Sequence, residues 1–303
     1  MFKLDKILRA LCFLSILLII QSCDNQNSNI NQLTFSKQPI KSDKNYSFAI
    51  HPLHNPERLF KIFNPLILYL SKHIKGVTFT LEASRNYADF NKKMDKKLFD
   101  FALPNPYQTI QAIDNGYNVF AKMGDDKNFR GIIIVRKDST IKKFSDLRGK
   151  KVSYPAPTAL AATMMPQYLL YKNGINVLKD LTNIYVGSQE SSIMNVYYKN
   201  SDAAATWPTP WLALQKERPE LTKELYVKWE TPPLINNSLV AKNSIPKEMI
   251  QQVTFLLLSL NNSKEGLEIL QRMELSTFQS ASNNTYDVIR SFIKEFSLKV
   301  RPI

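Results

Sequence analysis

Apolar and polar positions alternate with two different periods along the chain from Tyr46 onward. Short apolar runs of strand length are separated by stretches in which apolar residues recur every three or four positions, the spacing of one helix face. The pattern predicts strands at 46–51, 77–81, 99–103 and 118–122, and helices at 56–74, 87–98 and 106–115. Asn55 is a suitable N-cap for the first helix, with Pro56 at its first position. This β-α-β-α alternation favours a parallel, doubly wound sheet.

A second α/β series begins at Gly131. A continuous apolar strand at 131–137 is followed by predicted strands at 151–154, 183–186, 202–207, 226–230 and 238–242. Helices are predicted between them at 158–173, 191–199 and 210–217, and the stretch 246–296 has a helical pattern throughout. The two α/β series together are long enough for one large or two medium domains.

The N-terminus has the layout of an export signal. Basic residues within the first nine positions precede an apolar run at 10–20, which is shorter than the roughly 20 residues that a membrane-spanning helix needs. The run ends in Ile20-Gln21-Ser22-Cys23, which resembles the lipobox of bacterial lipoproteins. We therefore predict a signal peptide at 1–22, lipidation of Cys23 and a flexible polar tether at 23–45. The alternative is an ordinary signal peptide with an incidental cysteine.

Cysteine and histidine usage limits the chemistry of the folded part. Of the two cysteines, Cys12 lies inside the predicted signal and Cys23 at its end, which leaves no disulfide and no thiol nucleophile. Three histidines without nearby cysteines predict no metal site, and no cofactor is expected.

The chain carries a formal net charge of +14. Its lysines are scattered and form no base-reading motif, so we expect no nucleic-acid partner. A basic surface above anionic lipid is the simpler interpretation, and it would also attract an anionic solute.

Short motifs in both series carry a family resemblance. They are Asn55-Pro56, Phe99-Asp100-Phe101-Ala102, Pro104-Asn105-Pro106-Tyr107, Ile134-Val135-Arg136-Lys137-Asp138-Ser139, Asp146-Leu147-Arg148-Gly149-Lys150, Gly187-Ser188, Asp202-Ala203-Ala204-Ala205 and Pro232-Pro233. In this order, from about Tyr46 to Pro246, the chain resembles the phosphate/phosphite/phosphonate-binding proteins of ABC importers. The resemblance implies the type 2 periplasmic binding-protein fold: α/β, with two doubly wound Rossmann-like lobes joined by two crossing strands. We place these strands at 131–137 and 238–242, lobe one at 46–130 plus 239–303, and lobe two at 131–238.

The resemblance also implies a ligand site in the cleft between the lobes. In the family, the loop after the first strand of lobe two is a Ser-Thr-Ser-Gly type run that holds an oxyanion at a helix N-terminus. The corresponding stretch here is 154–163, where only Thr158 clearly preserves a hydroxyl and two prolines remove N–H donors. In the next loop, Gln189 stands where the family usually has histidine, and a third loop holds Trp207 and Trp211 in place of polar residues.

The candidate ligand-binding residues lie in the loops that follow predicted strands. They are His51, Asn105, Tyr107, Tyr154, Thr158, Ala159, Ser188, Gln189 and Trp207. Trp207 could instead be a core aromatic and Tyr107 a lobe-packing residue. Arg85 and Arg130 fit exposed surface charges better than ligand clamps, and His54 is a further possible ligand contact.

These features predict non-enzymatic capture of a small, anionic, phosphonate- or phosphate-like solute and its delivery to an ABC permease. We expect an exported monomer, lipid-anchored at the periplasmic face of a bacterial membrane. Alternatives are the ligand-binding part of a sensory system, a binder of an aromatic or apolar acid, and a structural surface protein with an unused cleft. Enzymes also occur in this fold, but those relatives rely on cysteine-rich or cofactor-attaching motifs that this chain lacks.

Overall fold

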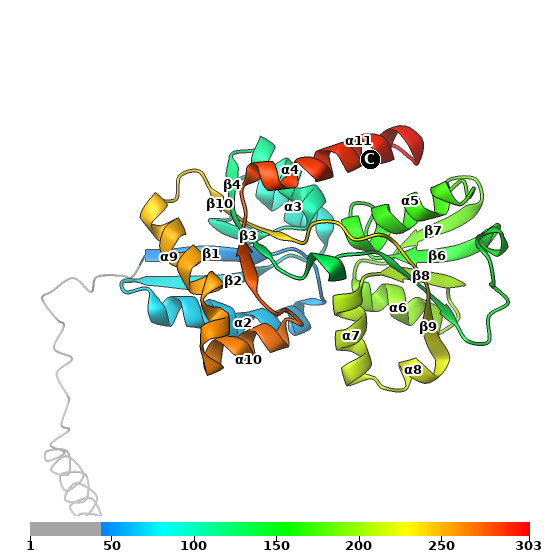
Figure 1. Ribbon diagram of the computed structural model, residues 1–303, viewed down its shortest axis with the longest axis horizontal. Coiled ribbons are helices and arrows are strands. Elements are labelled where there is room, and N and C mark those ends of the chain that lie inside the picture. The colour runs from blue at the N-terminus through cyan, green and yellow to red at the C-terminus, as the bar shows by residue number, and fades with distance from the viewer. Residues whose placement is uncertain (1–43) are drawn as a thin grey trace, which may run out of the picture. The chain divides into compact units, whose positions relative to one another are not determined.

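Two mixed β-sheets, of six and five strands, form the frame of residues 44–303, the part of the chain that the computed structural model describes (Figure 1). The predicted signal peptide, Cys23 and nearly all of the predicted tether lie outside the described residues. The first sheet with its helices is called lobe one below, and the second sheet with its helices lobe two.

Lobe one is built around the strand order β11-β4-β10-β3-β1-β2. Its strands are β1 (Lys44–Ile50), β2 (Val77–Ala83), β3 (Phe101–Leu103), β4 (Tyr117–Met123), β10 (Ser238–Lys242) and β11 (Phe278–Ser280). Its helices are α2 (Pro56–His73), α3 (Tyr87–Asp95), α4 (Pro106–Asp114), α9 (Lys247–Leu258), α10 (Lys264–Arg272) and α11 (Asp287–Lys299). The predicted cap of the first helix is present, since the Asn55 side chain accepts a hydrogen bond from the Arg58 N–H.

Lobe two has the strand order β7-β6-β8-β5-β9. Its strands are β5 (Ile132–Arg136), β6 (Lys150–Tyr154), β7 (Leu181–Tyr185), β8 (Ala203–Thr206) and β9 (Leu225–Glu230). Its helices are α5 (Met165–Lys172), α6 (Gln189–Tyr197), α7 (Pro208–Glu217) and the short α8 (Leu221–Glu224). A π-helical turn, η3 (Leu160–Met164), precedes α5, because Pro166 has no N–H with which to continue a regular ladder. The predicted helix 158–173 therefore begins two residues later than the sequence pattern indicated.

Each sheet contains an inserted antiparallel strand, so neither is wholly parallel as the alternation predicted. β10 pairs antiparallel with β3 and β4, and β5 pairs antiparallel with β8 and β9, whereas β1–β3 and β6–β8 are parallel neighbours. In both lobes the inserted strand is the first that the chain forms after arriving from the other lobe. It enters the sheet from the opposite end, which reverses its direction.

Two connecting segments, 124–131 and 231–237, cross between the lobes immediately before β5 and β10. The predicted crossings at 131–137 and 238–242 thus lie almost wholly inside the sheets, and the residues that cross precede them. The segments run side by side: the Thr231 N–H donates to the Gly131 carbonyl at 2.9 Å, and the Leu234 N–H to the Phe129 carbonyl at 2.9 Å.

The C-terminal region departs from its wholly helical prediction at β11. Phe278 pairs with Met123 and Ser280 with Ala121, which adds an edge strand beside β4. Three residues are too few to give a readable alternation. Beyond β11, helix α11 runs past α4 of lobe one toward α5 of lobe two (Figure 1). Arg290 of α11 forms an ion pair with Asp114 of α4, and Glu295 accepts a hydrogen bond from Tyr168 of α5.

Large apolar side chains from both faces of each sheet form the core. Phe48 and Ile50 of β1 pack with Phe101 of β3 and with Leu66 of α2 in the largest cluster, and all four are fully buried. None of the helices within residues 44–303 combines the length and apolar character that crossing a membrane requires.

Candidate ligand-binding site

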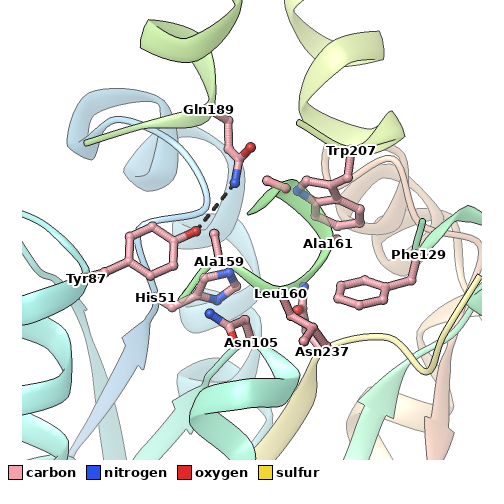
Figure 2. Close-up of a pocket in the computed structure, with 11 residues that line it drawn as sticks. His51, Tyr87, Asn105, Phe129, Ala159, Leu160, Ala161, Gln189, Trp207 and Asn237 are labelled. Atoms are coloured by element: carbon pink, nitrogen blue, oxygen red, sulfur yellow. Dashed lines mark hydrogen bonds between the residues drawn. The ribbon is translucent and has the colours of Figure 1, made fainter. Parts of the chain in front are cut away.

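A small pocket with about 210 Å³ of empty space lies where the lobes and their connecting segments meet (Figure 2). Its lining residues are His51, Tyr87, Asn105, Phe129, Ala159, Leu160, Ala161, Ala162, Gln189, Trp207 and Asn237. A water-sized sphere can occupy only about 10 Å³ of this space, far below the roughly 300–1,000 Å³ of pockets for drug-sized ligands, so the pocket suits a ligand of few heavy atoms.

A larger hollow, with about 680 Å³ of empty space, lies between α5, α11 and the segment 231–234. Its lining is almost wholly apolar, with Met165, Leu169 and Phe292 among its side chains. Because binding sites for small polar solutes need converging polar groups, the smaller pocket is the stronger candidate.

The start of η3 brings free backbone donors to the pocket. The first helical bonds run from the Thr163 and Met164 N–H groups to the Ala159 carbonyl, at 2.8 and 3.2 Å. Within residues 44–303 the N–H groups of Leu160, Ala161 and Ala162 have no hydrogen-bond acceptor. Unsatisfied amides at a helix N-terminus favour an anion, and alanine side chains leave the backbone open to close approach.

Gln189 and Tyr87 meet across the pocket from opposite lobes (Figure 2). The Gln189 Oε1 accepts a hydrogen bond from the Thr206 hydroxyl at 2.8 Å, and its Nε2 donates to the Tyr87 hydroxyl at 3.4 Å. Burial raises the pKa of Tyr87 far above its ordinary value, so the phenol stays neutral and can donate. The pair therefore presents an amide hydrogen and a hydroxyl hydrogen to a ligand.

His51 lies at the end of β1 and is 2 % exposed. Its Nδ1 is 2.9 Å from the Leu103 carbonyl oxygen. Burial lowers the pKa of His51 to about 4, although the bond to Leu103 opposes the shift, and the charge of His54 lowers it further. His51 is therefore neutral at pH 7. Since Nδ1 faces a carbonyl it carries the hydrogen, and Nε2 is left as a hydrogen-bond acceptor.

Three other lining residues shape the rest of the pocket. The Asn105 side chain caps α4 and donates to the Thr158 carbonyl at 3.3 Å, which joins the lobes. The Trp207 ring packs edge-on against Phe129, with 5.4 Å between centroids. Together these two rings make an apolar end.

Five of the residues predicted from the sequence line this pocket: His51, Asn105, Ala159, Gln189 and Trp207. The other four lie elsewhere, and three have structural partners that account for them. Tyr154 is buried in lobe two beside Tyr185, with 5.9 Å between ring centroids. Ser188 caps α6 by accepting from the Ser191 N–H, and the Tyr107 hydroxyl accepts from Gln111.

Thr158 contributes its carbonyl to Asn105, while the pocket lining begins one residue later at Ala159. Arg85 is 88 % exposed and Arg130 pairs with Glu230 at 2.6 Å, in keeping with surface roles. Leu160, Ala161 and Ala162 also line the pocket; they lie in the predicted 154–163 loop but were not singled out as ligand contacts. Tyr87, Phe129 and Asn237 line the pocket as well and lie outside the predicted loops. Only Tyr87 gave a usable signal, as the first residue of a helix that follows a strand end.

Beside the pocket, an ionic cluster that is buried except at Glu217 joins the lobes. Glu190 of α6 accepts from His54 Nδ1 at 3.0 Å and from Arg58 of α2 at 3.4 Å, and Arg58 also bonds Glu217 at the end of α7. We call His54, Arg58, Glu190 and Glu217 the latch. Burial would raise the pKa of Glu190, but the hydrogen bond and charge of His54, together with Arg58, hold that pKa below its usual value. Glu190 is therefore ionised at neutral pH.

Residues 48–286 match the family described as the periplasmic substrate-binding protein of phosphonate ABC transporters. The chain belongs to this family. The "Phosphonates-binding periplasmic protein" of Escherichia coli K12 is 22 % identical over 253 residues, which span 80 % of this chain and 74 % of that protein. The family assignment and the fold class predicted from the sequence are thereby confirmed.

Solved structures agree on the fold of this phosphonate-family protein. The binding-protein component of an ABC phosphonate transporter from Pseudomonas aeruginosa has a TM-score of 0.78 and 20 % identity, covering 84 % of this chain and 87 % of the other. PhnD1 of Prochlorococcus marinus, in complex with methylphosphonate, has a TM-score of 0.76 and 21 % identity, covering 84 % of this chain and 99 % of the other.

Proposed function

We propose that this periplasmic binding protein captures a small phosphonate-type oxyanion in the pocket between its lobes and presents it to an ABC permease. The observation that carries the proposal is the convergence of the free Leu160, Ala161 and Ala162 N–H groups with Gln189 and Tyr87 on one small pocket. A phosphonate head has three oxygens that can accept from these donors. The methylphosphonate complex of PhnD1 supports the same ligand class.

The anion would be recognised by uncharged hydrogen-bond donors rather than by charged side chains. Within residues 44–303, no lysine, arginine, aspartate or glutamate lines the pocket. Hydrogen bonds to a charged ligand are worth about 1.5–3 kcal/mol each, so several fixed donors can hold an anion without a cation. The apolar end at Phe129 and Trp207 would receive the short organic group. This role is binding and release, with no covalent chemistry.

Closure of the lobes would complete the site, because donors come from both. Gln189 bonds Tyr87 and Asn105 bonds the Thr158 carbonyl across the cleft, so opening separates these groups. A ligand that touches both sides shifts the population toward the closed form. For this motion we propose the predicted lobes, 46–130 plus 239–303 and 131–238, as the moving bodies, with the segments 124–131 and 231–237 bending between them.

Thermal-shift measurement and calorimetry with methylphosphonate test the proposed function. A ligand at a hundred times its dissociation constant should stabilise the protein by about 2.7 kcal/mol. Arg85→Ala, a change at an exposed side chain, is the matched control and should bind like the wild type. Absence of both a thermal shift and binding heat at millimolar methylphosphonate, phosphite and phosphate would refute the proposal.

We further propose that Cys23 is lipidated and tethers a monomeric protein to the membrane. The support is the Ile20-Gln21-Ser22-Cys23 sequence after a basic and apolar start. Mass spectrometry of the membrane fraction should find an acylated cysteine at the mature N-terminus. Cys23→Ser should abolish the acylation while ligand binding is retained. Wild-type protein recovered without lipid mass would contradict the anchor alone.

A further inference from the structure

The donors and acceptors of the pocket are unequal in number. The donors are three backbone N–H groups together with the side chains of Gln189 and Tyr87 and the indole N–H of Trp207, which has no acceptor among the described residues. Among the described residues, two side-chain atoms of the lining act as acceptors without a partner: Nε2 of His51 and Oδ1 of Asn237, the latter buried. A fully deprotonated ligand can use the donors only and leaves both acceptors unpaired.

The orientation of His51 decides which of its nitrogens meets the ligand. Nδ1 is used by the Leu103 carbonyl at 2.9 Å, so Nε2 is the ring atom left for the pocket, where Figure 2 shows the imidazole among the lining side chains. The edge-on contact with Tyr87, at 6.0 Å between ring centroids, and a second with Phe90, at 6.4 Å, hold the ring in place. The lone pair of Nε2 is therefore a fixed feature of the site.

The groups around His51 keep it neutral. His54 on the same loop adds a repulsive charge when protonated, and burial lowers the pKa of His51 to about 4. Tyr87 of α3 is a neutral phenol. The carboxylate of Glu190 on α6 is occupied by His54 and by Arg58 of α2, at 3.0 and 3.4 Å. The last residue of β3 contributes the Leu103 carbonyl, and the segment between β3 and α4 contributes the uncharged Asn105.

We propose that the pocket selects the singly protonated, monoanionic form of its oxyanion, with the ligand hydroxyl donating a hydrogen bond to His51 Nε2. The inference rests on the proposed function and narrows its ligand class. A phosphonate near neutral pH exists partly as R–PO₂(OH)⁻, which supplies both the acceptors that the backbone donors need and the donor that His51 needs. A sulfonate, R–SO₃⁻, has the same shape and charge but no proton. One of its oxygens would therefore face the lone pair of His51 Nε2 without a hydrogen between them.

Methylphosphonate and methanesulfonate form a matched pair for the test. The affinities of both ligands for the full chain are measured by calorimetry from pH 6 to pH 9. At pH 6, methylphosphonate should bind roughly 10- to 100-fold more tightly than methanesulfonate. Above the second ionisation of the ligand its affinity should fall about tenfold per pH unit, because the complex holds a proton that free ligand and protein lack. Binding at pH 9, measured in buffers of different ionisation enthalpy, should take up about one proton. Methanesulfonate affinity should not depend on pH in this range.

The variant His51→Asn tests the role of Nε2 as the hydrogen-bond acceptor. Asparagine can keep the bond to the Leu103 carbonyl but has no atom at the position of Nε2, so the preference for phosphonate over sulfonate should fall to near one. His73→Asn is the control, since His73 Nδ1 also lies beside a backbone carbonyl, that of Tyr69 at 2.8 Å, while His73 belongs to neither the pocket lining nor the latch, and the preference should persist. A preference unchanged in His51→Asn overturns the assignment to His51.

Several results with the wild-type protein overturn the proposal without any variant. They are equal affinity for the two ligands, methylphosphonate affinity that does not change with pH, and sulfonate affinity that rises as the pH falls, which would mean that His51 itself is protonated. The proposed function survives each of them. Failure to bind either ligand at any pH removes both proposals.

Discussion

Arg58→Met tests whether the latch stabilises the closed, ligand-holding form. Arg58 is 6 % exposed and donates from α2 in lobe one to Glu190 and Glu217 in lobe two. Methionine keeps much of the side-chain volume but removes the charge and the donors. Glu190, with its side chain 10 % exposed, would keep only His54. Its Oε2 already has no hydrogen-bond partner among the described residues.

The cost follows from the burial of each partner. Removing one member of a buried ion pair costs about 3–5 kcal/mol, because the other charge stays desolvated. Here the remaining His54 contact offsets part of that cost, and Glu217, half exposed at 51 %, contributes less than about 1 kcal/mol. We therefore expect the closed form to lose about 2–3 kcal/mol relative to the open form, in which water reaches Glu190. Methylphosphonate should then bind roughly 30- to 150-fold more weakly.

Calorimetry gives the affinity, and small-angle scattering of the ligand-free protein gives the radius of gyration, which should increase in Arg58→Met. Lys216→Met is the matched control. Lys216 also bridges the lobes, bonding Glu274 at 2.5 Å, but it is 63 % exposed and should matter by less than about 1 kcal/mol. A folded Arg58→Met protein with unchanged affinity and radius, or with no larger effect than Lys216→Met, would refute the role of the latch.

Three further predictions concern the pocket itself. A Cβ at position 131 would lie 2.6 Å from the Ala161 carbonyl oxygen and displace the start of η3. Gly131→Ala should therefore weaken methylphosphonate binding at least about tenfold in calorimetry. Unchanged binding would contradict the placement of the ligand at the start of η3. Gln189→Ala should weaken binding about 10- to 150-fold, whereas Thr158→Ala should not, and the reverse ranking would move the site toward Thr158. The free energy of unfolding, measured with urea, should fall by about 3 kcal/mol between pH 6.5 and pH 4, because His51 becomes protonated in the unfolded chain over that range but stays neutral in the folded chain, where its pKa is about 4. In His51→Asn the free energy of unfolding should depend less on pH over this range. A pH dependence identical to that of the wild type would show that His51 is not responsible.

The elements of the fold were readable because their signals are local. Asn55 followed by Pro56 marks the start of α2, and the apolar runs mark β1 to β10 to within a few residues. The direction of β5 and β10 was not readable, since a strand has the same alternation whichever way it runs. β11, three residues long, was too short to leave a pattern.

The site was only partly predictable, because it depends on how side chains turn at strand ends. Tyr154 ends β6 as expected, but it stands opposite Tyr185 in the register of β7, and the two rings pack in lobe two instead of reaching the cleft. The π turn at 160–164 moved the free amides two residues past Thr158. Phe129 and Asn237 lie on the connecting segments, where no periodic pattern exists to interpret.

The positions of Gln189 and Glu190 suggest how capture and closure are coupled. The two residues are consecutive in the first turn of α6, which Ser188 caps, so they move as one rigid piece. Gln189 lines the pocket, and Glu190 contacts Arg58 and His54 in the latch. In the proposed function, a ligand that draws Gln189 toward Tyr87 would therefore also bring Glu190 to Arg58, and the charged contact would add to closure without entering the pocket. The lining within residues 44–303 has no charged side chain, so the proposed selection would rest on fixed dipoles, which can distinguish protonated from unprotonated oxygens, whereas a cation there would attract any anion.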